Sequence, residues 1–369
     1  MKRFLLIIAL SVLLDHVQAQ EVFRTIPATG NKKATVSEWV GITTVEISYN
    51  RPAVKGREGK IWGQVVHYGF ADLDYGTSKA APWRAGANEN TTISFSTDVY
   101  VEGKPLAKGK YGFFVAMGKE KATLVFSKHN TAWGSFYYNP KDDALRVDVP
   151  VIQTSESVEW LKYEFTEQTA NSAVVALQWE KVKIPFKVSV DLEKEQIAEY
   201  RRAIYAGEFY RYWQNMQQAA NYCLVNDMNI DEGLEWAKMS VEHYFGEANF
   251  LTLSTYAGLL RKKGNIQKAD SLMSVALPKA TFNQLFSYAL NLARQKKFQE
   301  SFEAFKMNHT KFPNNPDAIL GMAYGYAAIS NFKEAIKMAE KAKAMYPDSN
   351  SKAYVDKLIT DIQANKVQF

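Results

Sequence analysis

The sequence is poor in the residues that bind metals or form disulfides. Its 369 residues contain one cysteine, Cys223, and five histidines. One cysteine excludes a disulfide within the chain and a zinc site of the cysteine-rich type. No two histidines are spaced to share a metal ion on one strand or helix face, and the HExxH motif is absent. We therefore predict no metal centre, and no cofactor is indicated.

The sequence also lacks the short motifs of catalysis and nucleotide binding. It contains no GxSxG, no GxxxxGK[ST] and no glycine-rich turn between a strand and a helix. Lysine and arginine number 45 against 39 acidic residues, for a net charge of +6. This mild, dispersed excess does not indicate nucleic-acid binding. These absences favour a non-catalytic protein, and no catalytic residue is assigned.

Residues 1–19 have the pattern of a cleavable signal peptide. Two basic residues precede an apolar run from Phe4 to Leu14, and Val17 and Ala19 occupy the −3 and −1 positions before Gln20. Eleven apolar residues are too few for a membrane span, which needs about 20. No cysteine stands at the cleavage point to carry a lipid. We expect a periplasmic or extracellular product that is not a lipoprotein and has no membrane span after cleavage.

Residues 20–190 have the periodicity of strands. Apolar and polar residues alternate, or short apolar runs occur, between turns that contain glycine or proline. Such segments are residues 45–49, 93–95, 111–117, 123–126, 161–165, 173–179 and 184–190. No alternation of strands with helices appears. We therefore predict an antiparallel domain that resembles a β-sandwich.

Residues 191–369 are predicted to form an α-helical repeat array. Pro313 and Pro347 lie 34 residues apart, and apolar and small residues recur at the same interval before them. Ala289 and Ala323 are one such pair. This pattern resembles the tetratricopeptide repeat, a helix–turn–helix unit of 34 residues. Less regular units are expected around residues 253–276 and 214–247, and a capping helix at residues 351–364.

The resemblance to tetratricopeptide repeats implies a concave face that contacts a protein or peptide partner. On the 34-residue register we place four apolar residues on this face: Phe286, Leu290, Leu320 and Tyr324. A groove with four exposed apolar residues is a candidate partner site. The alternative is that the β domain or the capping helix of the same chain covers this face.

The β half contains a dense set of glycine, tryptophan, arginine and asparagine residues. The motifs are Asn50-Arg51-Pro52, Lys60-Ile61-Trp62-Gly63, Pro82-Trp83-Arg84, Lys110-Tyr111-Gly112, Ala132-Trp133-Gly134 and Trp179-Glu180-Lys181. Together they resemble a secreted bacterial family known as domain of unknown function 2911, over about residues 30–190. The resemblance implies export and an architecture with helical repeats behind the β domain. It implies no reaction.

Seven residues of these motifs are candidates for a ligand site: Arg51, Lys55, Arg57, Trp62, Arg84, Asn88 and Glu89. Guanidinium groups bind carboxylates and phosphates, and amide side chains can hydrogen-bond sugars. We predict that Arg84 and Glu89 serve one site with Arg51 and Arg57. They hold either each other, as an ion pair that fixes a loop, or an anionic or hydroxylated ligand.

Two functions remain open on the sequence alone. The first is an exported, non-catalytic binding or scaffold protein of the cell envelope, whose helical repeats contact another protein. The second is a hydrolase directed at envelope or glycan material, or a protein that binds an anionic or glycan ligand without turnover. The second interpretation rests on the Arg84 and Glu89 segment.

Overall fold

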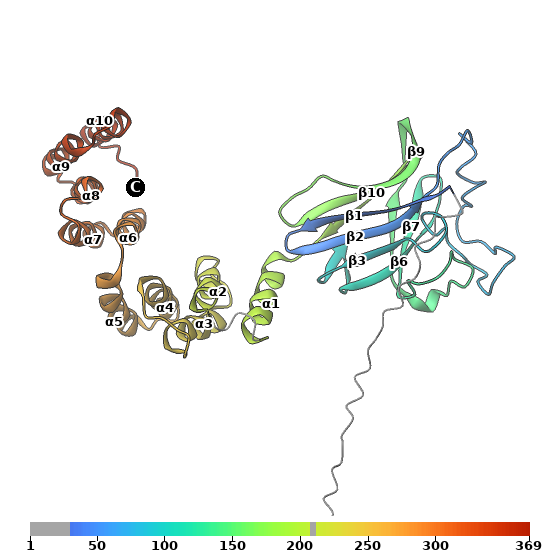
Figure 1. Ribbon diagram of the computed structural model, residues 1–369, viewed down its shortest axis with the longest axis horizontal. Coiled ribbons are helices and arrows are strands. Elements are labelled where there is room, and N and C mark those ends of the chain that lie inside the picture. Colours follow the sequence, from blue (N-terminus) through green and yellow to red (C-terminus); the bar gives the residue numbers. More distant parts are fainter. Residues whose placement is uncertain (1–29, 207–211) are drawn as a thin grey trace, which may run out of the picture. The chain divides into compact units, whose positions relative to one another are not determined.

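A computed structural model describes residues 30–206 and 212–369. They form two compact units that divide between Gln196 and Ile197 (Figure 1). The first unit consists of antiparallel strands and the second of helices, which confirms the predicted fold class. The predicted signal peptide, residues 1–19, lies outside the described residues, and its cleavage stays a prediction.

The strands of the first unit form two antiparallel sheets. One sheet has the order β1-β2-β3-β6-β7-β8 and the other β5-β4-β10-β9. The strand bounds are β1 Lys32–Val40, β2 Thr43–Arg51, β3 Thr92–Phe95, β4 Val99–Val101, β5 Lys104–Leu106, β6 Gly109–Ala116, β7 Lys121–Ser127, β8 Asp143–Pro150, β9 Ile152–Thr166 and β10 Ser172–Ser189. A 3-10 turn, Pro140–Asp142, precedes β8.

The core of this unit lies between the two sheets. Phe113 on β6 and Phe126 on β7 pack against Phe186 on β10, with ring centroids 5.5 and 6.3 Å apart. Tyr49 on β2 contacts Tyr163 on β9, with ring centroids 4.7 Å apart. Burial of these large rings from both inner faces contributes to the apolar contact that holds the sheets together.

Strand β10 is longer than the sequence predicts because a bulge joins two of the expected segments. Before the bulge the odd-numbered residues, such as Trp179, face the core, and after it the even-numbered residues do, beginning with Val182. The pairing register with β9 shifts on both sides of Glu180, whose φ is 52°. One extra residue inverts the alternation without ending the strand, so the periodicity resembles two separate strands.

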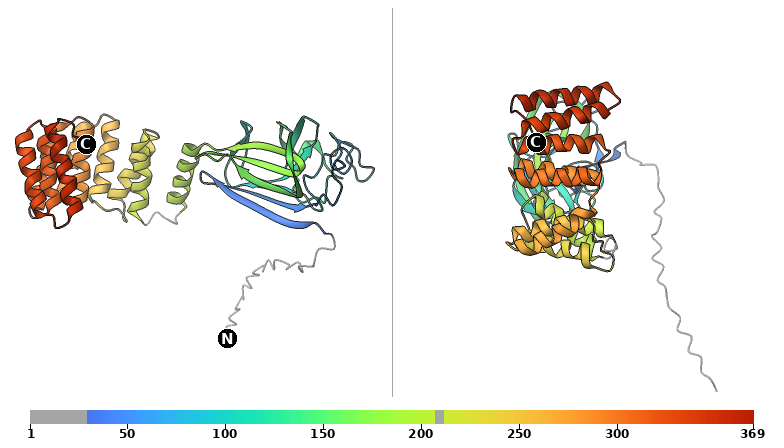
Figure 2. Two further views of the ribbon diagram at one scale, coloured as in Figure 1. Left: turned by 90° about the horizontal axis from the view of Figure 1, so that it is seen from above. Right: turned by 90° about the vertical axis from the view of Figure 1, so that its left-hand side faces the viewer.

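The second unit is a stack of helices, side by side in Figures 1 and 2. The helix bounds are α1 Leu192–Tyr205, α2 Trp213–Val225, α3 Ile230–Glu242, α4 Phe250–Lys262, α5 Ile266–Ala276, α6 Phe282–Arg294, α7 Phe298–Lys311, α8 Pro316–Ala328, α9 Phe332–Met345 and α10 Ser349–Gln363. The short 3-10 turn Leu277–Lys279 follows α5. Helix α1 spans the division between the units. No helix in the described part of the chain has the length and apolarity that crossing a membrane requires.

Consecutive helices pair as the 34-residue period predicts. Ala289 on α6 and its equivalent Ala323 on α8 are fully buried. Two larger residues replace the alanines expected at close helix contacts, and both form hydrogen bonds to the preceding helix. Ser301 Oγ donates to the carbonyl of Ala289 at 2.8 Å, and Asn308 Nδ2 donates to the carbonyl of Phe282 at 3.2 Å. These bonds satisfy the hydroxyl of Ser301 and the amide nitrogen of Asn308, whereas Asn308 Oδ1 is buried without a partner in the described part of the chain.

Candidate functional site

The loop of residues 83–91 is fixed to the β-sandwich by buried hydrogen bonds. Trp83 exchanges two main-chain bonds with Val115 on β6, at 2.9 and 2.8 Å. The carbonyl of Ala85 accepts from two hydroxyls, Thr91 Oγ1 at 3.0 Å and Tyr163 Oη at 2.7 Å. Burial strongly raises the pKa of Tyr163, so this phenol stays a donor. The loop is therefore a rigid support for the side chains that it carries.

The half-buried side chain of Arg84 connects parts of this loop. Its guanidinium donates to the carbonyl of Asn88 at 2.8 Å and lies over the ring of Phe136, 5.3 Å from the centroid. Gly134, with φ of 71°, leaves space for the Arg84 guanidinium, since a Cβ at position 134 would stand 2.6 Å from Arg84 Cζ. Burial lowers the pKa of Arg84. An ion pair with Glu89, one of the two predicted alternatives, is not present among the described residues.

Glu89 instead lies at an exposed edge and lines a polar pocket of about 240 Å³. Its carboxylate accepts a hydrogen bond from Asn50 Nδ2 at 2.6 Å. Lys33 and Lys110 line the same pocket. The site therefore combines one carboxylate, two ammonium groups and several amides, which suits a small polar ligand.

Asn90 contributes a buried amide to the polar pocket. Its side chain is 7% exposed, and its Nδ2 is 3.4 Å from the carbonyl of His129. Its Oδ1 is buried without a hydrogen-bond partner in the described part of the structure. A buried acceptor without a partner costs about 1–3 kcal/mol. Trp133 lies beside Glu89 through a main-chain bridge, with 58% of its surface exposed.

The other cationic candidates have separate partners. Arg51 Nε donates to the carbonyl of Leu161 on β9 at 2.8 Å. Arg57 donates to two main-chain oxygens of its own loop at 2.7 and 2.9 Å. Lys55 is exposed, with φ of 50°. The structure therefore does not bring these three groups into direct contact with Glu89, and whether they bind a ligand stays a prediction.

Trp62 belongs to a cluster of three tryptophans. Its ring lies 5.8 Å from Trp83 and 5.9 Å from Trp179, both with edge-to-face geometry. Trp83 and Trp179 stack at 6.1 Å. These contacts connect the loops of the motif region to β10 and make Trp62 part of the core packing.

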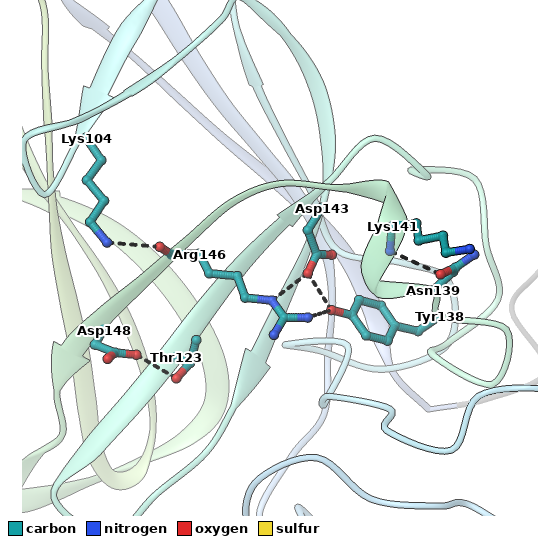
Figure 3. Close-up of polar contacts among 8 residues, drawn as sticks. All are labelled: Lys104, Thr123, Tyr138, Asn139, Lys141, Asp143, Arg146 and Asp148. Atoms are coloured by element: carbon teal, nitrogen blue, oxygen red, sulfur yellow. Dashed lines mark hydrogen bonds and ion pairs between the residues drawn. The ribbon is translucent and has the colours of Figure 1, made fainter.

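A polar network that the sequence did not predict fixes the loop before β8 (Figure 3). Tyr138 donates its hydroxyl proton to Asp143 at 2.7 Å, and Arg146 contacts both partners, at 2.5 Å to the carboxylate and 2.7 Å to the hydroxyl. Arg146 also lies over the ring of Phe70 at 5.0 Å. Burial, followed by the Asp143 contact, raises the pKa of Tyr138. The Asn139-Pro140 turn marks this segment, but its spacing does not reveal which side chains meet.

In the helical unit, the four predicted groove residues line one cavity of about 390 Å³. Phe286 and Leu290 on α6 are half-buried, whereas Leu320 and Tyr324 on α8 are only 5% and 7% exposed. Of the two alternatives, an exposed face or a face covered by the same chain, the burial of the α8 pair favours the second. Whether the cavity holds a partner stays a prediction.

The same chain covers Tyr324 on α8. Phe369, from the segment after α10, lines the cavity and packs on Tyr324 with ring centroids 6.4 Å apart. Tyr354 on α10 shares a hydrogen bond with Tyr324 at 2.5 Å between the hydroxyls. Burial, then this bond, raises the pKa of Tyr324. Arg294 at the rim supplies a cation beside the apolar floor.

The comparisons with known proteins bear on the β unit first. Residues 31–188 match the model of the family described as "Protein of unknown function (DUF2911)". The resemblance expected from the motifs is confirmed. A search of curated proteins finds no match.

A search of solved structures matches the chain to "Crystal structure of YrrB: a TPR protein with an unusual peptide-binding site". The match has 19% sequence identity and a TM-score of 0.29, and it covers 44% of this chain and 83% of that one.

A substitution in the region that matches the family model tests the role of Arg84 directly. Because Arg84 bonds a carbonyl and an aromatic face but no carboxylate, we expect Arg84→Ala to destabilise this unit by about 1–2 kcal/mol. Glu89→Gln, at an exposed position, is the control and is expected to change stability by less than about 0.5 kcal/mol. Urea denaturation measures both. A loss of about 3–5 kcal/mol for Arg84→Ala would indicate a buried charged partner and contradict this assignment.

Proposed function

We propose that the protein is an exported, non-catalytic scaffold of the cell envelope, whose helical repeats bind an extended peptide segment of a partner. The groove of α6 and α8 carries this proposal, because its apolar floor holds a phenylalanine of the chain itself. A surface that accepts one aromatic side chain provides the kind of buried anchor on which interfaces depend.

The size and chemistry of the groove favour a peptide over a folded surface. A cavity of about 390 Å³ has room for a few side chains. Phe286, Leu290 and Leu320 supply apolar contact, while Arg294 and Asp317 at the same cavity can bond main-chain or side-chain groups. An apolar centre with a polar rim is typical of recognition sites for short segments.

Selection from a random peptide library on the full chain tests the proposal. We expect enriched peptides with an aromatic anchor, whose affinity falls at least about tenfold in Leu290→Asp, since a carboxylate on the apolar floor is costly to desolvate. Ser287→Asp, at an exposed position of the same helix, is the matched control and should leave binding unchanged. Circular dichroism checks that both variants fold. The proposal fails if no peptides are enriched, or if they bind folded Leu290→Asp as well as the parent.

Export rests on the pattern of residues 1–19 alone. N-terminal sequencing of the protein recovered outside the cytoplasm is expected to return Gln20 or Glu21 as the first residue. Recovery of Met1 would overturn this part of the proposal.

The polar pocket supports a second candidate function, the binding of an anionic or glycan ligand by the β unit. The lining of the pocket favours it, since the exposed Glu89 carboxylate can accept from hydroxyl groups and the ammonium groups of Lys33 and Lys110 can donate to anionic groups. The exposed indole of Trp133 adds an aromatic face nearby. Saturation-transfer NMR against neutral and uronic-acid oligosaccharides tests it. Signals that disappear in Glu89→Gln support binding at this pocket, whereas the absence of any signal rejects it.

A further inference from the structure

The segment after α10 is directed back toward the groove by the way that helix ends. Asn365 has a left-handed φ of 54°, and its N–H donates to the carbonyl of Ile362 at 3.0 Å. The N–H of Lys366 donates to the carbonyl of Asp361 at 2.8 Å. This pair of bonds is the Schellman arrangement, in which a left-handed residue satisfies the last carbonyls and reverses the chain. Figure 1 shows the end of the chain beside α6 and α8.

The returning segment makes specific contacts in the groove. The ring of Phe369 lies 6.3 Å from that of Phe298 and 6.4 Å from that of Tyr324. Arg294 Nε donates to the main-chain oxygen of Phe369 at 2.8 Å. Val367 also packs against the core of the last repeats. An aromatic ring, an aliphatic side chain and a main-chain hydrogen bond together form a small interface.

The burial pattern shows which features of the segment matter. Val367 and Phe369 are half-buried, while Lys366 and Gln368 are exposed. This alternation is that of an extended strand with one face on the protein. In this segment two apolar residues two positions apart therefore face the last repeats: Phe369 lines the cavity, and Val367 packs against the neighbouring core.

We propose that residues 366–369 are an intramolecular ligand of the groove, and that a partner segment with the same pattern, aliphatic-x-aromatic, competes with them. The inference rests on the proposed function, because it assumes that the groove is the partner site. Since the segment is tethered, its local concentration is high, and a partner must displace it. The apparent affinity for a partner is then reduced by the fraction of molecules in which the groove is free.

Fluorescence anisotropy with a labelled peptide of residues 364–369 tests the proposal. The full chain is compared with a chain that lacks residues 366–369, and with Phe369→Ala and its matched control Lys366→Ala, at an exposed position of the same segment that does not line the cavity. We expect the shortened chain and Phe369→Ala to bind the peptide at least about tenfold more tightly than the full chain and Lys366→Ala do. A peptide with alanine in place of its phenylalanine should not bind. Arg294→Ala in the shortened chain should weaken peptide binding. Because Arg294 is exposed, we do not expect this substitution to unfold the protein.

The inference is overturned if the folded shortened chain binds the peptide no better than the full chain. The library-selected peptides separate this failure from that of the proposed function. If they bind the groove with equal affinity in the full and shortened chains, the groove is a partner site without an internal ligand. If the shortened chain binds residues 364–369 but selects no other peptide, the segment is an internal ligand of the groove, and the proposal that the groove binds a partner is rejected.

Discussion

Replacing Trp179 with alanine is expected to destabilise the β unit by about 3–5 kcal/mol, the range for removal of a buried tryptophan. Its side chain is 1% exposed on β10 and contacts the rings of Trp62 and Trp83. The cavity that remains would lie between the loops of the motif region and the sheet. Both the lost apolar burial and the unfilled volume therefore contribute.

Trp179→Phe is the control for this prediction. Phenylalanine keeps an aromatic ring in the cluster, and it removes Nε1, which is buried without a partner in the part of the chain described. We expect a clearly smaller loss than for alanine. Hydrogen-exchange mass spectrometry locates the effect, with faster exchange in peptides of β10 and unchanged exchange in peptides of α8. A loss below about 1 kcal/mol for Trp179→Ala would show that the cluster is not a packing centre.

The second large effect is expected from Ala323→Trp in the helical unit. Ala323 is fully buried on α8, which packs against both α7 and α9. No space exists for an indole, and overpacking of a close helix contact costs about 1–3 kcal/mol or more. We expect a lower melting temperature for this unit and loss of peptide binding, because Leu320 and Tyr324 lie on the same helix.

Ala344→Trp is the matched control for this substitution, because Ala344 is an exposed alanine on the neighbouring helix α9. We expect it to leave the melting temperature nearly unchanged. Circular dichroism at 222 nm follows the helical unit in both variants. Equal melting temperatures for Ala323→Trp and the parent would mean that the 34-residue register is wrong.

The repeats could be predicted from the sequence because their determinants are local and periodic. Pro313 and Pro347 each lie two residues beyond the end of a helix, α7 and α9. Small residues recur at the contacts where two helices approach closely. Such signals need no knowledge of distant partners, and the helix pairs therefore appear where the period places them.

The long strand β10 shows where periodicity misleads. A single bulge at Glu180 inverts which residues face the core. A pattern of period two before and after one extra residue resembles two strands with a break. Nothing in the composition of the segment distinguishes a bulge from a turn, since Glu180 is not a glycine or a proline.

The candidate site was less predictable because its partners are far apart in the chain. Glu89 and Arg84 were expected to hold either each other or a shared ligand. Glu89 bonds Asn50, and Arg51 bonds the carbonyl of Leu161. Composition shows which groups can form polar contacts, whereas the fold decides which of them meet. The return of Phe369 to the groove likewise depends on a left-handed residue at Asn365, which the helical pattern does not indicate.

The most direct test of the account is methyl NMR of the full chain with a library-selected peptide. Leu290 and Leu320 lie on the floor of the proposed partner groove, and Leu161 and Leu177 lie in the core of the β unit. The account predicts that peptide addition shifts the methyl resonances of Leu290 and Leu320 and leaves those of Leu161 and Leu177 in place. Binding that shifts only the β-unit resonances would contradict the claim that the helical groove is the partner site.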